Sequence, residues 1–377
     1  MKKKIFTLVV TFLMATSCAG CSFTEKNRTV TKEEAHSFCD DDLRIGDIRD
    51  VANTEDGFYF IGEYGLSYYD NECKEATLLC MDSGCKHNSM DCNAFSVGLY
   101  GEIYYNNGKL YSMECVPGEN GNYDFYLVEI SKDATEITRL TKLFQTSEMG
   151  GFTHELILHR GYCYFYVGPD SYETEKENSV FRVKIEKNAK VETIYTDRGY
   201  GVDYSLIGYE DCVYIRADKY LDADGREQEE VLLIYDGNTG KIKSSERDDF
   251  LRITFGNGCM YFTTSDSLWK REEGKKEEKI YDFGGELFGE LRFDGTYFYF
   301  DTQADCYMKD LDRTERKVYV IDQQGELKEI LEIPFEYNFA TCDKEKSVWK
   351  NLIGSKVGIC YTKNIGSGKT RLEEIKQ

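Results

Sequence analysis

The chain has few prolines, few histidines and few long apolar stretches. Among its 377 residues are three prolines, four histidines and two tryptophans. After the N-terminal segment, no apolar run approaches the roughly 20 residues that a membrane-spanning helix needs, so the remainder is expected to be soluble. The sequence also lacks the Gly-x-Ser-x-Gly, phosphate-loop and dinucleotide fingerprints, which removes the enzyme classes that depend on them.

Basic residues are in the minority as well. Forty-seven lysines and arginines face 68 aspartates and glutamates, which gives a formal net charge of −21. The sequence has no basic stripe that would neutralise phosphates, so we expect no nucleic-acid partner. The acidic excess is expected to serve solubility rather than the recognition of a substrate.

The N-terminus is typical of a signal peptide. Lysines at positions 2–4 precede an apolar run from Ile5 to Met14, which is too short to span a bilayer. The following Ala-Gly-Cys21 resembles the lipobox of bacterial lipoproteins, in which the signal is cut before a cysteine that is then acylated, for example with palmitate. We predict a lipoprotein signal peptide over residues 1–20 and lipidation of Cys21, with Cys18 as the alternative; an ordinary secretory signal is the competing interpretation.

Cysteine is abundant for a chain outside the cytoplasm. Of 14 cysteines, 12 remain if Cys18 leaves with the signal and Cys21 carries the lipid. This even number allows complete pairing in disulfides. In an anaerobic habitat, many of the same residues would instead be free, buried thiols.

Aromatic residues make up 14% of the chain, and a short aromatic signature recurs along it. A turn residue, two variable positions and an aromatic follow one another in seven places, separated by 51, 53, 50, 47, 37 and 63 residues. These copies are Gly57–Phe60, Gly108–Tyr111, Gly161–Tyr164, Asp211–Tyr214, Gly258–Tyr261, Gly295–Phe298 and Gly358–Tyr361. Alternating strands and hairpin turns flank them, which is typical of a repeated β-module.

Two hairpins per module predict a four-stranded antiparallel sheet. About seven such sheets, each packing an aromatic face on its neighbour, make an all-β β-propeller over residues 44–377. A large β-sandwich or two smaller β-domains are the alternatives. The last module is expected to lack its outer strand, so we predict that residues 21–43 act as an anchor linker and supply the strand that closes the ring.

Between the first two modules lies a cluster of soft metal ligands. Cys80, Cys85, His87 and Cys92 offer three thiolates and one imidazole, a set that suits a tetrahedral zinc ion. Closing the loop around a metal would rigidify a segment that has no core of its own. The spacing differs, however, from the common zinc-finger patterns.

Disulfides are the alternative interpretation of this cluster. Cys80–Cys92 or Cys85–Cys92 would form a bridge in an oxidising compartment, and Cys73 and Cys115 are further candidate partners. No acid–base partner is visible around the cluster. A structural metal or a disulfide is therefore favoured over a catalytic metal.

Together these features resemble a known group of proteins. The lipobox, the tyrosine-rich modules and the segment Leu79-Cys80-x4-Cys85-x-His87-x4-Cys92-Asn93-Ala94 look like the β-propeller lipoproteins of Gram-positive gut anaerobes, which are related to the low-density-lipoprotein-receptor-related type of propeller domain. Many relatives have a proline between the first two cysteines, where this chain has Met-Asp-Ser-Gly. The resemblance implies a surface-anchored propeller and carries no established activity.

Other motifs are expected to be structural. His154 and His159 are five apart in a strand-like segment, whereas the zincin pattern needs two histidines four apart on a helix. The acidic stretch that begins at Asp222 lacks the first and last ligands of a calcium loop. Four cysteines inside or beside the aromatic signature are expected to pack between sheets: Cys163, Cys212, Cys259 and Cys360.

We expect the chain to act at the extracytoplasmic face of the cell membrane, anchored through its N-terminal lipid, as a monomeric binding or scaffolding module. Its ligand would be a peptide, a glycan or a protein bound on the face of the propeller that carries the Cys80–Cys92 loop. A propeller-type hydrolase, lyase or quinoprotein is the competing class, and a metal or redox role for the loop is the third.

Overall fold

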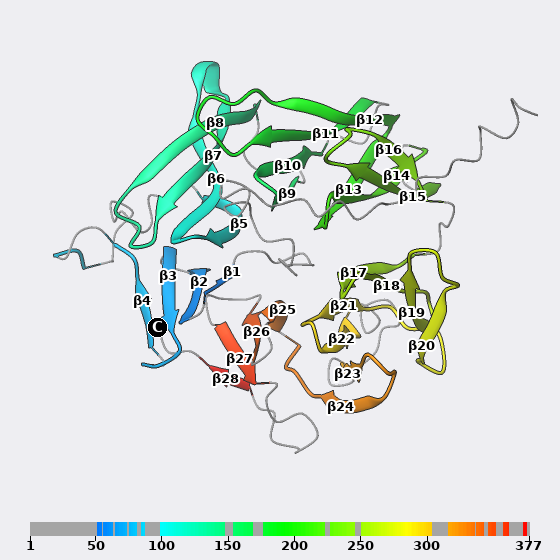
Figure 1. The fold of residues 1–377 in the computed structure, drawn as a ribbon. Helices are drawn as coiled ribbons and strands as arrows, with labels where there is room; N and C mark the ends of the chain where they lie inside the picture. The colour runs from blue at the N-terminus through cyan, green and yellow to red at the C-terminus, as the bar shows by residue number, and fades with distance from the viewer. Residues whose placement is uncertain are drawn as a thin grey trace, which may run out of the picture. The chain divides into compact units, whose positions relative to one another are not determined.

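A computed structural model describes the greater part of the chain after residue 50 (Figure 1). The described residues are 51–54, 56–62, 65–73, 75–80, 84–86, 99–147, 154–168, 176–222, 227–245, 250–303, 316–335, 337–342, 346–351, 357–361 and 372–374. Within them, no helix is long and apolar enough to cross a membrane. The predicted signal peptide, linker and lipidation site at residues 1–43 lie outside the described residues.

The strands of the described ranges form seven four-stranded sheets, and each sheet is built from four strands that are consecutive in the chain. The sheets comprise, in order, β1 (Val51–Asn53), β2 (Gly57–Gly62), β3 (Gly65–Asp70) and β4 (Glu75–Leu78); β5 (Leu99–Asn106), β6 (Lys109–Pro117), β7 (Tyr123–Ser131) and β8 (Ile137–Thr146); β9 (His154–His159), β10 (Tyr162–Val167), β11 (Lys176–Lys184) and β12 (Glu192–Gly199); β13 (Gly201–Tyr209), β14 (Cys212–Tyr220), β15 (Gln228–Asp236) and β16 (Ile242–Ser244); β17 (Arg252–Gly256), β18 (Cys259–Thr263), β19 (Ser267–Glu272) and β20 (Glu278–Asp282); β21 (Glu290–Phe293), β22 (Tyr297–Asp301), β23 (Val318–Asp322) and β24 (Leu327–Leu331); and β25 (Tyr337–Cys342), β26 (Lys346–Asn351), β27 (Val357–Tyr361) and β28 (Leu372–Glu374). A single turn of 3-10 helix, η2 (Glu119–Gly121), precedes β7.

Consecutive sheets bury their faces against each other. One hydrophobic cluster joins the first sheet to the second, and further clusters join each following pair through to the sixth sheet and Tyr337 of β25. First strands of neighbouring sheets are in contact, as β1 with β5, β9 with β13 and β17 with β21, and β1 also contacts β25 of the last sheet. The predicted all-β propeller is therefore confirmed.

The aromatic signature marks the second strand of the first six sheets, because its turn leads directly into β2, β6, β10, β14, β18 and β22. Asn107 and Gly108 both adopt positive φ in the first of these hairpin turns that is fully described, as a tight turn between twisted strands requires. The aromatics Tyr164, Tyr261 and Phe298 are almost fully buried between sheets. They supply the packing that the repeat predicted.

The seventh copy of the signature does not mark the second strand of its sheet, although the sequence predicted that it would. Gly358–Tyr361 lies on β27, the third strand of its sheet, whereas the second strand is β26. The last sheet is also complete, because β28 pairs with β27 as its fourth strand. The expectation that this sheet lacks its outer strand is therefore wrong; whether residues 21–43 contribute a strand elsewhere lies outside the described residues.

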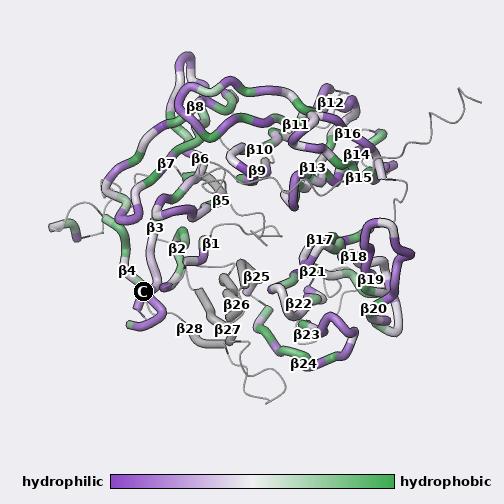
Figure 2. The backbone as a smooth tube through the Cα atoms, in the orientation of Figure 1, coloured by the Kyte–Doolittle hydropathy of each residue, from purple (hydrophilic) through white to green (hydrophobic). Residues whose placement is uncertain are grey.

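Several smaller predictions concern turns and strands. His154 and His159 lie on strand β9, as expected, and the His159 ring is buried with Nε2 2.9 Å from the Glu210 carbonyl oxygen. Gly274 has φ +72° in the turn between β19 and β20, and this turn is hydrophilic in Figure 2. The Asp236 carboxylate accepts hydrogen bonds from two backbone amides in the turn that joins β15 to β16. These segments are structural hairpins.

Candidate functional site

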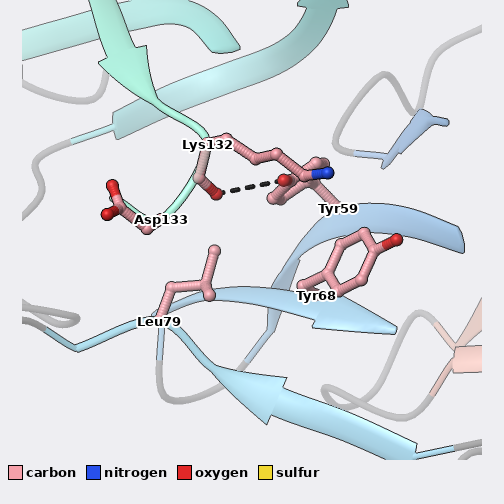
Figure 3. Close-up of a pocket in the computed structure, with 5 residues that line it drawn as sticks. All are labelled: Tyr59, Tyr68, Leu79, Lys132 and Asp133. Atoms are coloured by element: carbon pink, nitrogen blue, oxygen red, sulfur yellow. Dashed lines mark hydrogen bonds between the residues drawn. The ribbon is translucent and has the colours of Figure 1, made fainter. Parts of the chain in front are cut away.

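A pocket of about 490 Å³ lies between the first sheet and the turn that joins β7 to β8 (Figure 3). Five described residues line it: Tyr59, Tyr68, Leu79, Lys132 and Asp133. Leu79 directly precedes Cys80, so the pocket adjoins the start of the predicted cysteine loop. Its volume falls within the range of small-ligand sites, which span roughly 300–1,000 Å³.

Tyr59 forms the inner wall of the pocket and ties the two sheets together. Its side chain is 1% exposed, and its hydroxyl donates a hydrogen bond to the Lys132 carbonyl oxygen at 3.0 Å, the dashed line in Figure 3. The ring stacks on Tyr105 of β5 with centroids 5.7 Å apart. Burial, reinforced by the neighbouring tyrosines, raises the pKa of Tyr59 well above its usual value, so its hydroxyl stays protonated and remains a donor.

Tyr68 and Leu79 form the floor. Tyr68 pairs with Tyr59 across β2 and β3, and the two rings lie 4.7 Å apart at 49°. The Tyr68 hydroxyl reaches to within 3.4 Å of Thr54 Oγ1. The Leu79 amide donates to the Leu66 carbonyl oxygen at 2.9 Å, which extends the edge of the sheet beyond β4. Both floor side chains are only partly buried, so they offer apolar surface to a ligand.

The turn from Ser131 to Glu136 holds the opposite rim in a fixed conformation. Asp133 Oδ1 accepts hydrogen bonds from Ser131 Oγ at 2.7 Å, from Thr135 Oγ1 at 2.8 Å and from the Thr135 amide at 3.2 Å. Ala134 completes the turn with a φ of 56°. These bonds, from Ser131 first and Thr135 next, lower the pKa of Asp133 to about 2, so the rim carries a carboxylate at any ordinary pH.

The exposed lining of the pocket is mainly apolar. It combines two tyrosine rings and a leucine with parts of Lys132 and Asp133. The Asp133 carboxylate points away from Tyr68 in Figure 3, toward its partners in the turn.

The buried charges elsewhere join neighbouring sheets. Arg316, whose side chain is 1% exposed, holds Asp301 through two bonds, Nε to Oδ1 at 2.9 Å and Nη2 to Oδ2 at 2.5 Å. Its Nη1 donates to the carbonyl oxygens of Pro334 and Tyr337, at 3.0 and 2.5 Å. This arginine thus fixes the connection from the sixth sheet into the seventh.

A second group of charges joins the fifth and sixth sheets. Arg252 Nε donates to Glu290 Oε1 at 2.6 Å, and Arg292 Nη1 lies 3.3 Å from Glu290 Oε2. Burial opposes ionisation of Glu290, but the charges of Arg252 and Arg292 outweigh it and hold the pKa of this carboxyl below its usual value. Because both arginines hold the same carboxylate, the group serves as a clasp between the fifth and sixth sheets.

The structure describes only part of the predicted metal site. Cys80 and Cys85 are both partly buried, whereas His87 and Cys92 lie outside the described residues, as do Cys18 and Cys21. Among the residues that are described, no three His, Cys, Asp or Glu side chains are close enough to hold a metal ion. The choice between zinc and a disulfide therefore stays a prediction.

The accessory disulfide partners that the sequence suggested, Cys73 and Cys115, also remain a prediction, because Cys92 lies outside the described residues. Cys73 is exposed and Cys115 is partly buried. Cys73 lies in an acidic turn in which Asp70 raises the pKa of its thiol. Cys163 and Cys259 are free thiols buried in the clusters between sheets, as the sequence predicted, and burial raises the pKa of Cys163 well above its usual value.

Comparison with known proteins adds little beyond the fold. A zinc-finger family model, zf-C2HCIx2C, matches residues 1–52, which lie almost entirely outside the described residues. No curated protein sequence matches the chain significantly. Similar solved structures include BamB from Moraxella catarrhalis, with 12% identity, coverage of 85% of this chain and 95% of that one, and a TM-score of 0.42. The propeller domain of the Trilobed protease from Pyrococcus furiosus shows 11% identity, 73% and 84% coverage, and a TM-score of 0.45. We base the fold assignment on the sheet topology alone.

Sequence reasoning did not find the pocket. Tyr59 was visible only as a variable position of the first signature, and Lys132 follows it after 73 residues. The one local signal was the spacing Ser131-x-Asp133-x-Thr135, which is typical of a side-chain-capped turn. Nothing in the spacing shows that this turn packs on the first sheet.

Proposed function

We propose that this chain is an extracytoplasmic, lipid-anchored β-propeller that acts as a binding or scaffolding module, and that each of its seven sheets is one blade. The observation that carries the binding role is the open, mainly apolar pocket beside Leu79, which Tyr59 and Tyr68 line together with the turn at Lys132 and Asp133. Loops and clefts held by a rigid scaffold are where such folds usually bind their ligands. The anchor is inferred from the lipobox-like segment alone.

The paired state of the buried charges supports binding over catalysis. A propeller enzyme would need carboxylates or arginines left open toward its substrate. Here Arg316 holds Asp301, and Arg252 and Arg292 share Glu290. These pairs stabilise the junctions between sheets.

Metabolic labelling tests the anchor. Cells expressing the full chain are grown with an alkynyl analogue of palmitate, and the wild type is compared with Cys21→Ser and Cys18→Ser. We expect Cys21→Ser to abolish the label and Cys18→Ser to keep it. Loss in Cys18→Ser alone would move the anchor to the alternative site, and full labelling of both variants would refute lipidation at either cysteine.

Thermal unfolding tests the binding role. The full chain in detergent is heated with neutral sugars, with short peptides and without addition, and each mixture is then assayed for products. A ligand of the folded state raises the midpoint of unfolding by mass action. We expect stabilisation by one class without turnover. Conversion of a sugar or peptide to products would favour the enzyme, and no stabilisation by any class would count against the pocket as a binding site.

A further inference from the structure

Strand β4 forms the outer edge of the first sheet, and among the strands that the structure describes none pairs with its outer side. The Leu79 amide donates to the Leu66 carbonyl oxygen, which sets the phase of the ladder between β3 and β4. Because hydrogen-bonded and non-hydrogen-bonded pairs alternate in an antiparallel ladder, the backbone N–H and C=O groups of Ala76 and Leu78 point away from β3. These groups can therefore pair with an added strand.

This edge lacks the features that protect the other outer edges. Natural edge strands are often very short, bulged, or marked by lysine or proline, which discourages pairing with another chain. Among the described outer strands, β8, β12, β20 and β24 each pair with a shift of register, and β16 and β28 have three residues each. In contrast, β4 has four residues in unbroken register with β3 and contains no lysine or proline. It is the described outer edge most open to a further strand.

The pocket lies on one face of this edge. Thr77 pairs with Tyr68, and Leu79 follows on the same face, since side chains alternate along a strand. Tyr68 and Leu79 both line the pocket and are only partly buried (Figure 3). An added strand places every second side chain on this face, so one of them lies beside Leu79. An apolar side chain at that position would bury the exposed surface of the pocket.

The other end of the same face is acidic. Glu75 is exposed, and the turn before it contains Asp70 and Glu72 against one lysine, Lys74. Glu75 lies four residues before Leu79, which is about 13 Å along a strand that rises about 3.3 Å per residue. A lysine or arginine four positions from the apolar side chain would therefore lie opposite Glu75. Opposite charges on adjacent strands stabilise their pairing, so the edge is complementary to a basic residue at this spacing.

We propose that the edge of β4 and the adjoining pocket bind an extended peptide as an additional strand. An apolar side chain of the peptide lies beside Leu79, and a lysine or arginine four positions away lies opposite Glu75. The outward groups of Ala76 and Leu78 select a peptide, because an extended backbone offers donors and acceptors at the matching spacing. This inference rests on the proposed binding function and names its ligand class.

Calorimetric titration of the full chain in detergent tests the proposal. The probes are the end-blocked peptide Thr-Lys-Thr-Val-Thr-Phe-Thr and its reverse, Thr-Phe-Thr-Val-Thr-Lys-Thr, which cover both directions of an added strand. We expect one of them to bind. Replacing its Phe with Ala, or its Lys with Glu, should weaken binding by about tenfold, which corresponds to about 1.4 kcal/mol. N-methylation of alternate amides should abolish binding in one phase and spare it in the other, because only alternate amides face β4.

Three variants of the chain test the same contacts from the other side. Ala76→Pro removes an outward amide without removing a bond to β3, and it should abolish binding. Glu75→Lys should weaken binding of the lysine peptide about tenfold and strengthen binding of the peptide in which Glu replaces Lys. Glu273→Lys makes the same charge change in the exposed turn between β19 and β20 and is the matched control. Thermal midpoints confirm that each variant is folded.

The outcomes separate this proposal from the more general binding function. Binding that is unchanged by Ala76→Pro and by both patterns of N-methylation would refute strand addition. Equal effects of Glu75→Lys and Glu273→Lys would refute the contact with Glu75. Failure of both peptides to bind would overturn the proposal. If a sugar then stabilises the chain against heat, the binding function stands without it, whereas the absence of any stabilising ligand would count against both.

Discussion

The Tyr59 hydroxyl donates to the carbonyl oxygen of Lys132 at 3.0 Å and so joins the first sheet to the turn of the second. Tyr59→Phe removes this bond and leaves the ring packing intact. We expect the free energy of unfolding to fall by about 0.5–1.5 kcal/mol, the usual net value of one hydrogen bond. Tyr68→Phe is the control, because its hydroxyl makes only a long 3.4 Å contact and its loss should have a smaller effect in denaturant titrations.

Removing one partner of the Arg316–Asp301 pair should strongly lower the free energy of unfolding. Both side chains are almost fully buried, so Arg316→Ala leaves a carboxylate without its main partner, and such losses cost about 3–5 kcal/mol. Replacing both residues with apolar ones, as in Arg316→Met with Asp301→Leu, should recover part of that loss.

Calorimetric unfolding measures both variants. The exposed pair Lys275–Glu272 is the control, and Lys275→Ala should change stability by about 1 kcal/mol or less. Equal effects of Arg316→Ala and Lys275→Ala would show that the buried pair does not hold the sixth and seventh sheets together.

Removing either of two buried hydroxyl groups should affect the stability of the fold differently. Thr254 Oγ1 is fully buried and has no hydrogen-bond partner among the described residues, whereas the equally buried Ser112 Oγ donates to the Glu102 carbonyl oxygen at 2.7 Å. Thr254→Val should leave the stability unchanged or raise it by about 1 kcal/mol, since no bond is lost. Ser112→Ala should lower it by about 1–3 kcal/mol. The midpoints of denaturant unfolding measure both effects. A clear loss of stability in Thr254→Val would reveal a hydrogen-bond partner for its hydroxyl.

Asp133 should titrate far below an ordinary aspartate. Its folded pKa of about 2 lies below the usual value of about 3.9, so ionised Asp133 stabilises the turn above about pH 4. This contribution is lost as the pH falls toward 2. The carboxyl carbon resonance should report a midpoint near 2, and Ser131→Ala should move that midpoint upward. If the midpoint is unchanged in Ser131→Ala, then the hydrogen bond from Ser131 is not the main cause of the low pKa of Asp133.

The Cys80–Cys92 loop should behave as a structural clasp. Cys80→Ser and Cys85→Ser should each lower the thermal midpoint by roughly 5 °C or more, as expected when a metal ligand or a disulfide is lost. Cys73→Ser removes an exposed free thiol and should leave the midpoint unchanged. Metal content and thiol counts of anaerobically purified chain then distinguish zinc from a disulfide. Identical midpoints for all three variants would exclude a clasp through Cys80 or Cys85.

Most of the architecture was predictable because it depends on local alternation. Strands, hairpin turns and buried signature aromatics such as Tyr164 and Tyr261 follow from a period of two and from turn residues at fixed offsets. Packing cysteines such as Cys163 were predictable for the same reason. The misplaced seventh signature shows the limit of this reasoning: Gly358–Tyr361 has the local pattern of a second strand, and only its pairing with β26 and β28 makes it a third strand.

The pocket was beyond the reach of the sequence because its walls come from segments that are distant in the chain. The spacing of Ser131, Asp133 and Thr135 determines the turn, and the alternation of β2 and β3 determines which tyrosines share a face. Their meeting depends on how the first sheet twists and packs on the second, a relationship that no local pattern records. The sequence by itself determined the repeating sheets and their buried faces; the tertiary structure alone decided that Tyr59 would reach Lys132 and line the pocket, because that contact is a product of inter-sheet packing.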